Sequence, residues 1–343
     1  MKQLWLHTVR GYIRLGLFFY FKNIKAVNVE RVPKTGAVLF LANHQNALLD
    51  ALLIATKSGR FSYFLTRASV FQNGFITKIL KSLLMLPVYR LRDGWNNLSK
   101  NNAIFSKSAK LLSQDRAVAI FPEGSHNLNR TVRPLSKGFT RVIFEVFERY
   151  PKTHLQLVPV GFNYLQAEKF GDCVSLNFGD PIHLTINAIT DKNESRINLK
   201  AQVHQQICQL TSHIETENYD TTLKKLKDLK VDFLKPEAVN SCMASNFENC
   251  EPRRLDGFPN LKRFFKFCLI LALLVPYLIW KWGVQPKIQE IEFVSTFRFA
   301  VAISIVPIYI LILTVCLLVI ISLKLALLYL FGVLILTLLT IKL

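Results

Sequence analysis

A histidine and an aspartate lie six positions apart near the start of the chain, as His44 and Asp50 of the segment LANHQNALLDA. Such a pair suits general-base chemistry, because the carboxylate fixes the ring tautomer and stabilises the imidazolium that forms when the ring takes a proton. On one continuous helix the two side chains would diverge by about 120°. They can meet if His44 lies on a loop and Asp50 in the first turns of a helix with Asn46 as its N-cap. Taken alone, the pair also fits a structural hydrogen bond.

A second polar group follows a short apolar run, in the segment AIFPEGSHN at residues 119–127. Ligands of open α/β sheets bind where the strands end. We therefore expect Glu123 to accept hydrogen bonds from substrate hydroxyls, and Gly124 to let a ligand approach the backbone. A surface turn is the alternative reading of this segment.

Several cations surround these segments in the sequence, and their side chains are suited to phosphate. Arginine binds phosphate through two parallel hydrogen bonds, and lysine acts as a point charge. A solvated basic face is the alternative for any one of these cations, which are Arg90, Arg130, Arg133 and Lys137. The sequence contains no G-x-S-x-G, P-loop, G-x-G-x-x-G or H-E-x-x-H motif, and no nucleophile for a covalent intermediate is evident. Direct group transfer is therefore favoured.

Short apolar runs alternate with helical patterns between residues 26 and 235, which predicts an α/β fold with a mixed sheet covered by helices. The expected strands are 37–44, 62–69, 117–124, 154–164 and 174–182. The expected helices are 47–57, 72–86, 96–114, 136–149 and 195–215.

The chain divides into four parts by composition. Residues 1–24 have helical apolar spacing interrupted by Arg10 and Arg14, which predicts an amphipathic helix in the membrane interface, with a helix packed on the core as the alternative. Residues 25–235 form the expected catalytic domain, 236–262 a linker, and 263–343 a membrane segment of two or three apolar helices.

The apolar stretches of the membrane segment are 264–282, 300–323 and 325–341, and the last two are expected to form a tight hairpin or one bent element. Lysine and arginine residues precede the first stretch, which predicts a multi-pass protein whose catalytic domain faces the cytoplasm. The loop 283–299 is then expected on the opposite side of the membrane.

The overall composition limits the classes of binding partner that can be expected. The 343 residues are 51% hydrophobic with a net charge of +20, which excludes a mostly disordered chain and points to anionic lipid or nucleic acid. Residues 1–150 hold 23 of the basic residues against 7 acidic ones. No nucleic-acid motif occurs, so nucleic acid is not an expected partner. The six cysteines form no C-x-x-C pair, and we expect reduced thiols without a disulfide or a zinc site.

Together these motifs resemble a known family. The chain is similar to the glycerolipid acyltransferases of the PlsC type over about residues 25–215, through NHQNALLD, the segment ending in Arg90, FPEGSHN, PLSKG and VPVGFN in that order. The resemblance implies the fold of that family. It also implies transfer of a fatty acyl group from a thioester of coenzyme A or acyl carrier protein to a hydroxyl of a glycerol-phosphate-type lipid, in phospholipid synthesis. No metal or cofactor is implied.

The resemblance also implies roles for individual residues. His44 would take the hydroxyl proton and Asp50 would hold the ring in place. Substrate binding would fall to Asn43, Arg90, Glu123, Gly124, Arg130, Arg133 and Lys137. The expected partners are membrane lipids, the acyl thioester donor and a phosphorylated lipid acceptor.

The sequence departs from the family pattern at three places. Five residues rather than four separate His44 from Asp50, and Leu84 and Pro87 replace a glycine and a phenylalanine before Arg90. Ser125-His126 stands where threonine-arginine is usual. The identity of the acceptor therefore stays open, with an aminolipid as the alternative to a glycerol-phosphate lipid. A non-catalytic membrane-binding protein is the alternative to an enzyme.

Overall fold

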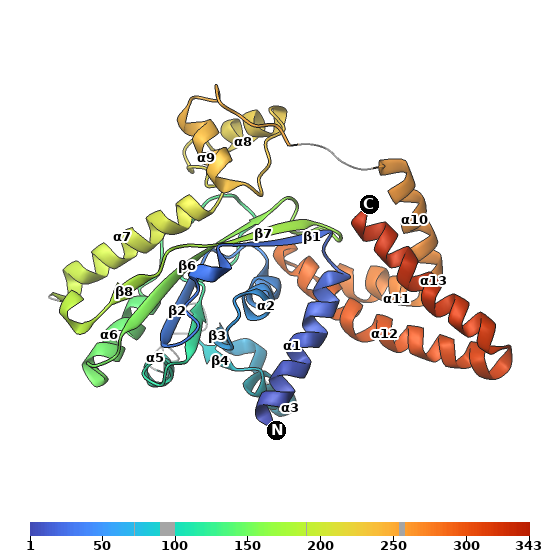
Figure 1. The fold of residues 1–343 in the computed structure, drawn as a ribbon, viewed down its shortest axis with the longest axis horizontal. Helices are drawn as coiled ribbons and strands as arrows, with labels where there is room; N and C mark the ends of the chain where they lie inside the picture. Colours follow the sequence, from blue (N-terminus) through green and yellow to red (C-terminus); the bar gives the residue numbers. More distant parts are fainter. Residues whose placement is uncertain (72, 90–99, 190, 254–257) are drawn as a thin grey trace.

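The structure is a computed structural model that describes residues 1–71, 73–89, 100–189, 191–253 and 258–343. Figure 1 shows an α/β domain on one side and a group of long helices on the other. Arg90, which the sequence singles out as a phosphate ligand, lies outside the described residues.

The α/β domain is built on one eight-stranded mixed sheet with the strand order β1-β7-β6-β2-β5-β3-β4, and β8 pairs with β6. β6 runs antiparallel to β7 and β8, whereas the other pairs are parallel. The mixed sheet confirms the predicted fold class. The strands are β1 (Asn23–Val27), β2 (Ala37–Ala42), β3 (Ser62–Arg67), β4 (Met85–Val88), β5 (Ala117–Ile120), β6 (Leu155–Tyr164), β7 (Cys173–Phe178) and β8 (Ile182–Leu184).

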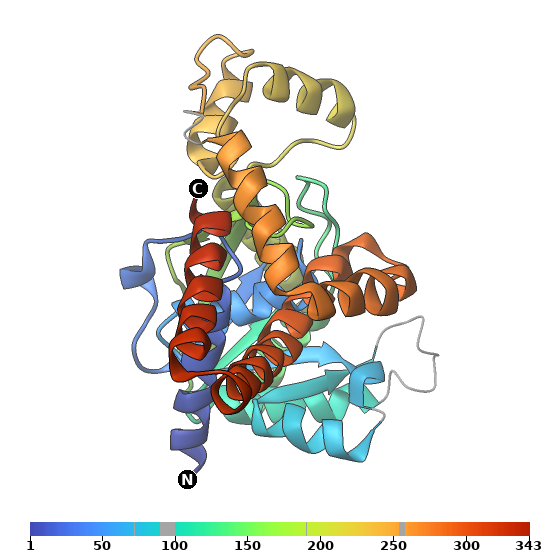
Figure 2. The ribbon, with the colours of Figure 1, turned by 90° about the vertical axis from the view of Figure 1, so that its right-hand side faces the viewer.

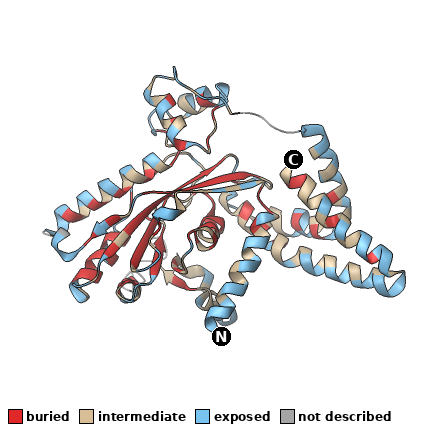
Figure 3. Ribbon diagram, viewed as in Figure 1, coloured by how far each residue is buried: buried red, intermediate tan, exposed pale blue. Residues whose placement is uncertain are grey.

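Helices cover both faces of the sheet. β2 shows why, since its alternate side chains enter two separate apolar clusters, Leu39 on one face and Phe40 on the other. The first face packs against α5 (Lys100–Leu112), α6 (Gly138–Arg149) and α7 (Lys192–Leu210). The second packs against α1 (Lys2–Phe18), α2 (Ala47–Lys57) and the first turns of α12 (Val294–Ile320). In Figure 3 the strands are mostly buried between these layers.

The expected helix at 72–86 differs from the structure. α3 (Gly74–Ser82) ends early, Leu84 takes a left-handed conformation with φ 63°, and β4 follows. β4 contains Pro87, which is tolerated because this strand lies at the edge of the sheet.

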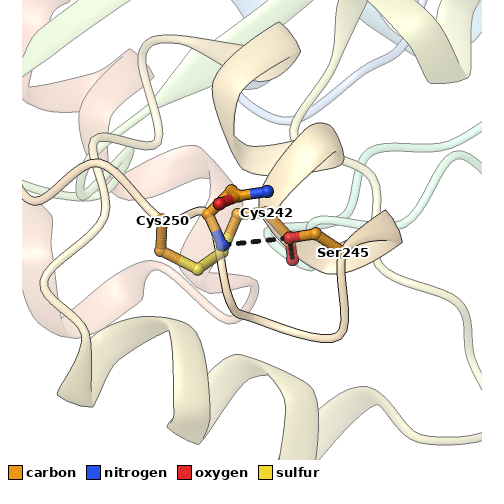
Figure 4. Close-up of a disulfide and its surroundings, with 4 residues drawn as sticks. Cys242, Ser245 and Cys250 are labelled. Atoms are coloured by element: carbon orange, nitrogen blue, oxygen red, sulfur yellow. Dashed lines mark hydrogen bonds between the residues drawn. A yellow bond between two sulfur atoms is a disulfide. The ribbon is translucent and has the colours of Figure 1, made fainter.

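A small helical unit lies beyond α7, with its own apolar cluster around Leu226 and Val239. It contains α8 (Tyr219–Asp228) and α9 (Pro236–Ala244), so the first part of the segment predicted as a linker forms a helix. Cys242 and Cys250 are joined by a disulfide beside Ser245 (Figure 4). The expectation of reduced thiols is therefore wrong for this pair, whose eight-residue separation carries no sequence signature.

The C-terminal helices form two bent units. α10 (Pro259–Ala272) and α11 (Leu274–Leu278) meet at a 98° bend, and the chain continues through η5 (Ile279–Val284), η6 (Gln285–Lys287) and η7 (Ile291–Phe293). α12 and α13 (Leu323–Lys342) form a hairpin and are each long and apolar enough to cross a membrane. Figure 2 shows these helices in front of the sheet domain.

The close contact between β6 and the end of α7 generates a test of the fold. A Cβ added to Gly161 would lie 2.1 Å from the carbonyl oxygen of Leu210, which is backbone and cannot rotate away. We expect Gly161→Ala to lower the free energy of unfolding by about 1–3 kcal/mol, as overpacking does. Gly11→Ala is the control, because nothing lies within 4 Å of that site on α1. Thermal unfolding in detergent checks the pair, and equal stability of Gly161→Ala and the parent would contradict the expectation.

Candidate active site

His44 and Asp50 meet at the end of β2. The Nδ1 atom of His44 lies 2.8 Å from Oδ2 of Asp50. His44 lies on the loop that follows β2, and Asp50 lies in the first turn of α2. Ala47, at the start of that helix, has a φ of 32°. The loop-then-helix arrangement expected from the sequence is thus the one found.

Asp50 is fully buried and accepts three further hydrogen bonds. The backbone N–H groups of Gln45 and Asn46 donate to Oδ2 over 2.9 and 2.8 Å, and the Tyr164 hydroxyl donates to Oδ1 over 2.6 Å. A carboxylate only accepts, so Nδ1 of His44 is the donor in this contact and Nε2 is the ring nitrogen left to face a substrate. The pair is therefore arranged for Nε2 to act as a base.

The start of α2 is capped differently from the sequence expectation. Asn46 is the N-cap residue, but its side chain makes no capping bond and donates instead to the carbonyl of Ala167 over 2.8 Å. The N–H of Leu48, one of the four groups a helix start leaves unpaired, donates to the Thr296 hydroxyl over 3.2 Å. A residue of α12 thus takes part of the role predicted for Asn46.

The loop after β5 packs directly on His44. The ring of Phe121 stacks on the imidazole with centroids 4.0 Å apart, and Asn127 N–H donates to the His44 carbonyl over 3.0 Å. Gly124 has a φ of 75°, a conformation that favours glycine, and it closes the turn through a bond to the Phe121 carbonyl. The FPEG segment therefore forms one wall around the imidazole.

Glu123 is buried beside this wall and is paired with Arg133. Nε of Arg133 lies 2.8 Å from the Glu123 carboxylate, and the same guanidinium donates to the hydroxyl and the carbonyl of Ser125. Burial raises the pKa of Glu123 to about 7, against the opposing effect of Arg133 and of the His44 backbone N–H. The carboxyl group of Glu123 therefore titrates near neutral pH, the range in which many enzymes work.

Arg130 and Asn43, which the sequence predicts as substrate ligands, form hydrogen bonds to the protein backbone. Arg130 donates to the carbonyls of Tyr164 and Leu165 and stacks on Phe233, and burial lowers its pKa to about 10. The Asn43 amide joins β2 to β6 through the N–H and C=O of Phe162. Lys137 is exposed just before α6.

Three residues near His44 were not expected from the sequence. Tyr164 ends the VPVGFNY segment and reaches Asp50, a role that only its place beside β2 reveals. The ring of His126 lies 5.6 Å from that of His44, and Phe293 packs on His126 at 4.5 Å. No local pattern marks Phe293, because it follows His126 by more than 160 positions.

One group of side chains near His44 could hold a metal ion. Among the residues that the structure describes, His126, Glu290 and Glu292 place their ligand atoms within 4.8 Å of one another. His126 and Glu292 are partly exposed, and Glu290 is exposed. The expectation from the sequence that the protein needs no metal stays a prediction.

Comparison with known proteins gives the context for this geometry. The sequence profile of a family described as Acyltransferase matches residues 23–163. A probable 1-acyl-sn-glycerol-3-phosphate acyltransferase of Mycoplasma pneumoniae is 29% identical over 143 residues, 40% of this chain and 51% of the relative. The chain thus spans about half the length of that relative. The 1-acyl-sn-glycerol-3-phosphate acyltransferase of Borreliella burgdorferi is 24% identical over 65% of this chain and 79% of its own.

A solved structure was also matched. The crystal structure of the 1-acyl-sn-glycerophosphate acyltransferase PlsC from Thermotoga maritima superposes with a TM-score of 0.44 and 15% identity, over 60% of this chain and 79% of that one. The matched profile begins with β1 and ends in β6, so it contains His44, Asp50 and the FPEG loop. Residues 23–163 of this chain therefore match an acyltransferase family model, and the relatives similar to this region are named 1-acyl-sn-glycerol-3-phosphate acyltransferases.

Proposed function

We propose that the protein is an O-acyltransferase of phospholipid synthesis that moves a fatty acyl group from an acyl thioester to a hydroxyl of a glycerol-phosphate-type lipid. The donor is a thioester of coenzyme A or acyl carrier protein. The observation that carries the proposal is the 2.8 Å contact between His44 and the buried Asp50 within the family-matched segment.

The proposed reaction is a direct transfer. Nε2 of His44 takes the proton of the acceptor hydroxyl while the hydroxyl oxygen attacks the carbonyl carbon of the thioester. The new C–O bond forms, the C–S bond breaks, and the imidazolium returns its proton to the leaving thiolate. Asp50 stabilises the imidazolium between these steps and is itself held by three other donors.

An apolar groove is suited to the acyl chain. It lies between α1, α2 and the β3–β4 edge, has a volume of about 110 Å³, and is lined by Ile13, Leu52 and Phe64 among others. α2 also carries Asp50, so one helix both lines the groove and holds the partner of the proposed base. The acceptor phosphate would be met by Lys137, Arg130 and Arg133, with Arg90 as a further proposed ligand.

Membrane attachment fits the exposed apolar side chains. α1 packs on α2 and α12 but exposes Leu4, Trp5 and Phe18, and the hairpin exposes most of its length. We propose a multi-pass membrane protein whose catalytic domain faces the cytoplasm, because basic residues gather at the start of α10.

A second acceptor class is favoured by one observation. Glu290 lies near His126, with Nδ1 to Oε2 at 3.9 Å, and Glu292 lies in the same group. Carboxylates beside His126, whose ring lies 5.6 Å from that of His44, suit an acceptor that bears an ammonium group, such as an aminolipid. A panel of glycerol-phosphate and amine-bearing acceptors, with mass spectrometry of the products, separates the two classes.

Replacing the proposed base tests the function. We expect His44→Ala to reduce turnover by about 10²–10⁴-fold, the usual effect of losing a general base, while the protein still folds and enters membranes. Acyl transfer is measured with the purified variant and an acyl thioester. His183→Ala, at an exposed position on β8, is the matched control and should keep parental activity. Parental turnover in His44→Ala would refute the assignment.

The raised pKa of Glu123 in the FPEG loop predicts that the stability of the protein depends on pH. The pKa of Glu123 is about 7 in the folded protein against an ordinary value of 4.5, so the folded state holds a proton that the unfolded state releases. The free energy of unfolding therefore falls as pH rises through roughly 5 to 7, by on the order of 3 kcal/mol at most, and stays lower above that window.

Glu123→Gln removes this titration. We expect the variant to gain stability relative to the parent as the pH is raised from acidic to alkaline, measured as thermal unfolding of both in one detergent. Glu217→Gln, at an exposed site, is the control. Parallel curves for the parent and Glu123→Gln would contradict the assignment of the titrating proton to Glu123.

A further inference from the structure

We infer that the C-terminal region crosses the membrane twice, as the α12–α13 hairpin alone, and that the apolar segment before it is re-entrant and returns to the active site. Both ends of the chain and residues 283–299 then lie on the same side as the catalytic domain. The inference concerns topology and does not depend on which reaction the site performs.

The catalytic domain holds the start of α12 through hydrogen bonds and apolar packing. The Ser295 hydroxyl donates to the Ala167 carbonyl over 2.7 Å, and Arg298 donates to the Glu168 carbonyl over 3.0 Å. Phe299 is fully buried in the cluster that contains Tyr20 and α2. This end of the hairpin is therefore part of the domain that carries His44.

The same domain also holds the end of α13. The ammonium of Lys342 donates to the carbonyls of Phe21 and Lys22 over 2.8 and 3.1 Å, and Lys22 donates to the carbonyl of Leu343 over 2.6 Å. A hairpin with both ends on one body enters and leaves the bilayer on one side. In Figure 1 its turn points away from the sheet.

The length and charge of the hairpin match a complete crossing. Lys324 and Lys342 bound an uncharged stretch of α13, and at 1.5 Å per residue they are about 27 Å apart, close to the ~30 Å hydrocarbon core. α12 has no charge after Arg298. Val319 and Ile320 near the turn are more than three-quarters exposed. Lys324 can extend its ammonium to the far headgroups, as lysines near helix ends do.

The segment before the hairpin turns back toward the catalytic domain. α10 runs beside α13, where the Tyr329 hydroxyl donates to the Ala272 carbonyl, and the chain then bends by 98° into α11. It returns through Trp280, whose ring lies 5.0 Å from the Arg298 guanidinium, to Phe293 beside His126. The expectation that 283–299 lies across the membrane from the site is therefore wrong in this structure.

The basic residues agree with this placement. Lys22 and Lys342 lie together at the base of the hairpin, and Lys262 and Lys266 lie in the first turns of α10. Cations of this kind gather at anionic headgroups on the cytoplasmic face, each adding about 1 kcal/mol of attraction. The turn of the hairpin, at the other end, has Lys324 as its charge.

Cysteine labelling tests the topology at positions where two and three crossings give opposite answers. Glu292→Cys, Lys324→Cys and Leu343→Cys are made separately in a chain whose six natural cysteines are serines, with Glu217→Cys marking the catalytic domain. A membrane-impermeant maleimide is applied to intact cells or spheroplasts and to inverted vesicles. We expect positions 292 and 343 to label from the same face as 217, and 324 to label from the opposite face.

The reverse pattern, with 292 and 343 opposite to 217, would establish three crossings and overturn the inference. Labelling of 324 from the face of 217, or from neither face, would overturn the complete crossing. Because the serine background could fail to fold, a second experiment keeps all natural cysteines and adds an epitope tag after Leu343. Protease should remove the tag in inverted vesicles and spare it in intact cells, and the opposite result would refute the hairpin.

Discussion

The site depends on a carboxylate that is removed from water and held by hydrogen-bond donors. Burying an ion is costly unless its oxygens are satisfied, and Asp50 meets this requirement with two backbone N–H groups, a phenol and an imidazole. The backbone donors come from the loop after β2 and the phenol from the end of β6. The sheet therefore fixes the carboxylate, and the carboxylate fixes the orientation of His44.

The C-terminal helices complete this arrangement. Thr296 caps the helix that carries Asp50, and the Ala167 carbonyl accepts from both Asn46 and Ser295. The C-terminal region thus contacts the loop that holds His44, and Phe293, just before α12, contacts His126. The two parts of the chain form one body around the imidazole.

Much of this could be predicted from the sequence where the signal is local. The strands β2 and β5 are short apolar runs that end in polar residues, and His44 and Asp50 lie close enough in sequence for their loop-then-helix geometry to be derived. The end of α3 before Leu84 could not be predicted, because neither a glycine nor a proline marks the residue that takes the left-handed conformation. The role of Tyr164 was missed because it requires the order of the strands.

The placement of residues 283–299 could not be derived from hydropathy. Hydropathy and charge counting treat each apolar stretch as independent, and they do not register that the stretch 264–282 is bent or that Thr296 pairs with Leu48. The disulfide between Cys242 and Cys250 could not be predicted for a related reason, since it depends on how the chain that follows α9 turns back toward that helix. In each case the deciding contact joins residues that no short pattern connects.

The close approach of α1 and α12 has a consequence for synthesis of the protein. Gly16 leaves room for Ile303, and the Tyr12 hydroxyl donates to the Ile303 carbonyl, so the first helix made is packed by one of the last. The ribosome releases α12 only after the whole sheet has emerged. The packing of α1 is thereby completed only after the C-terminal helices have been synthesised, so that a chain shortened before α12 would lack this contact.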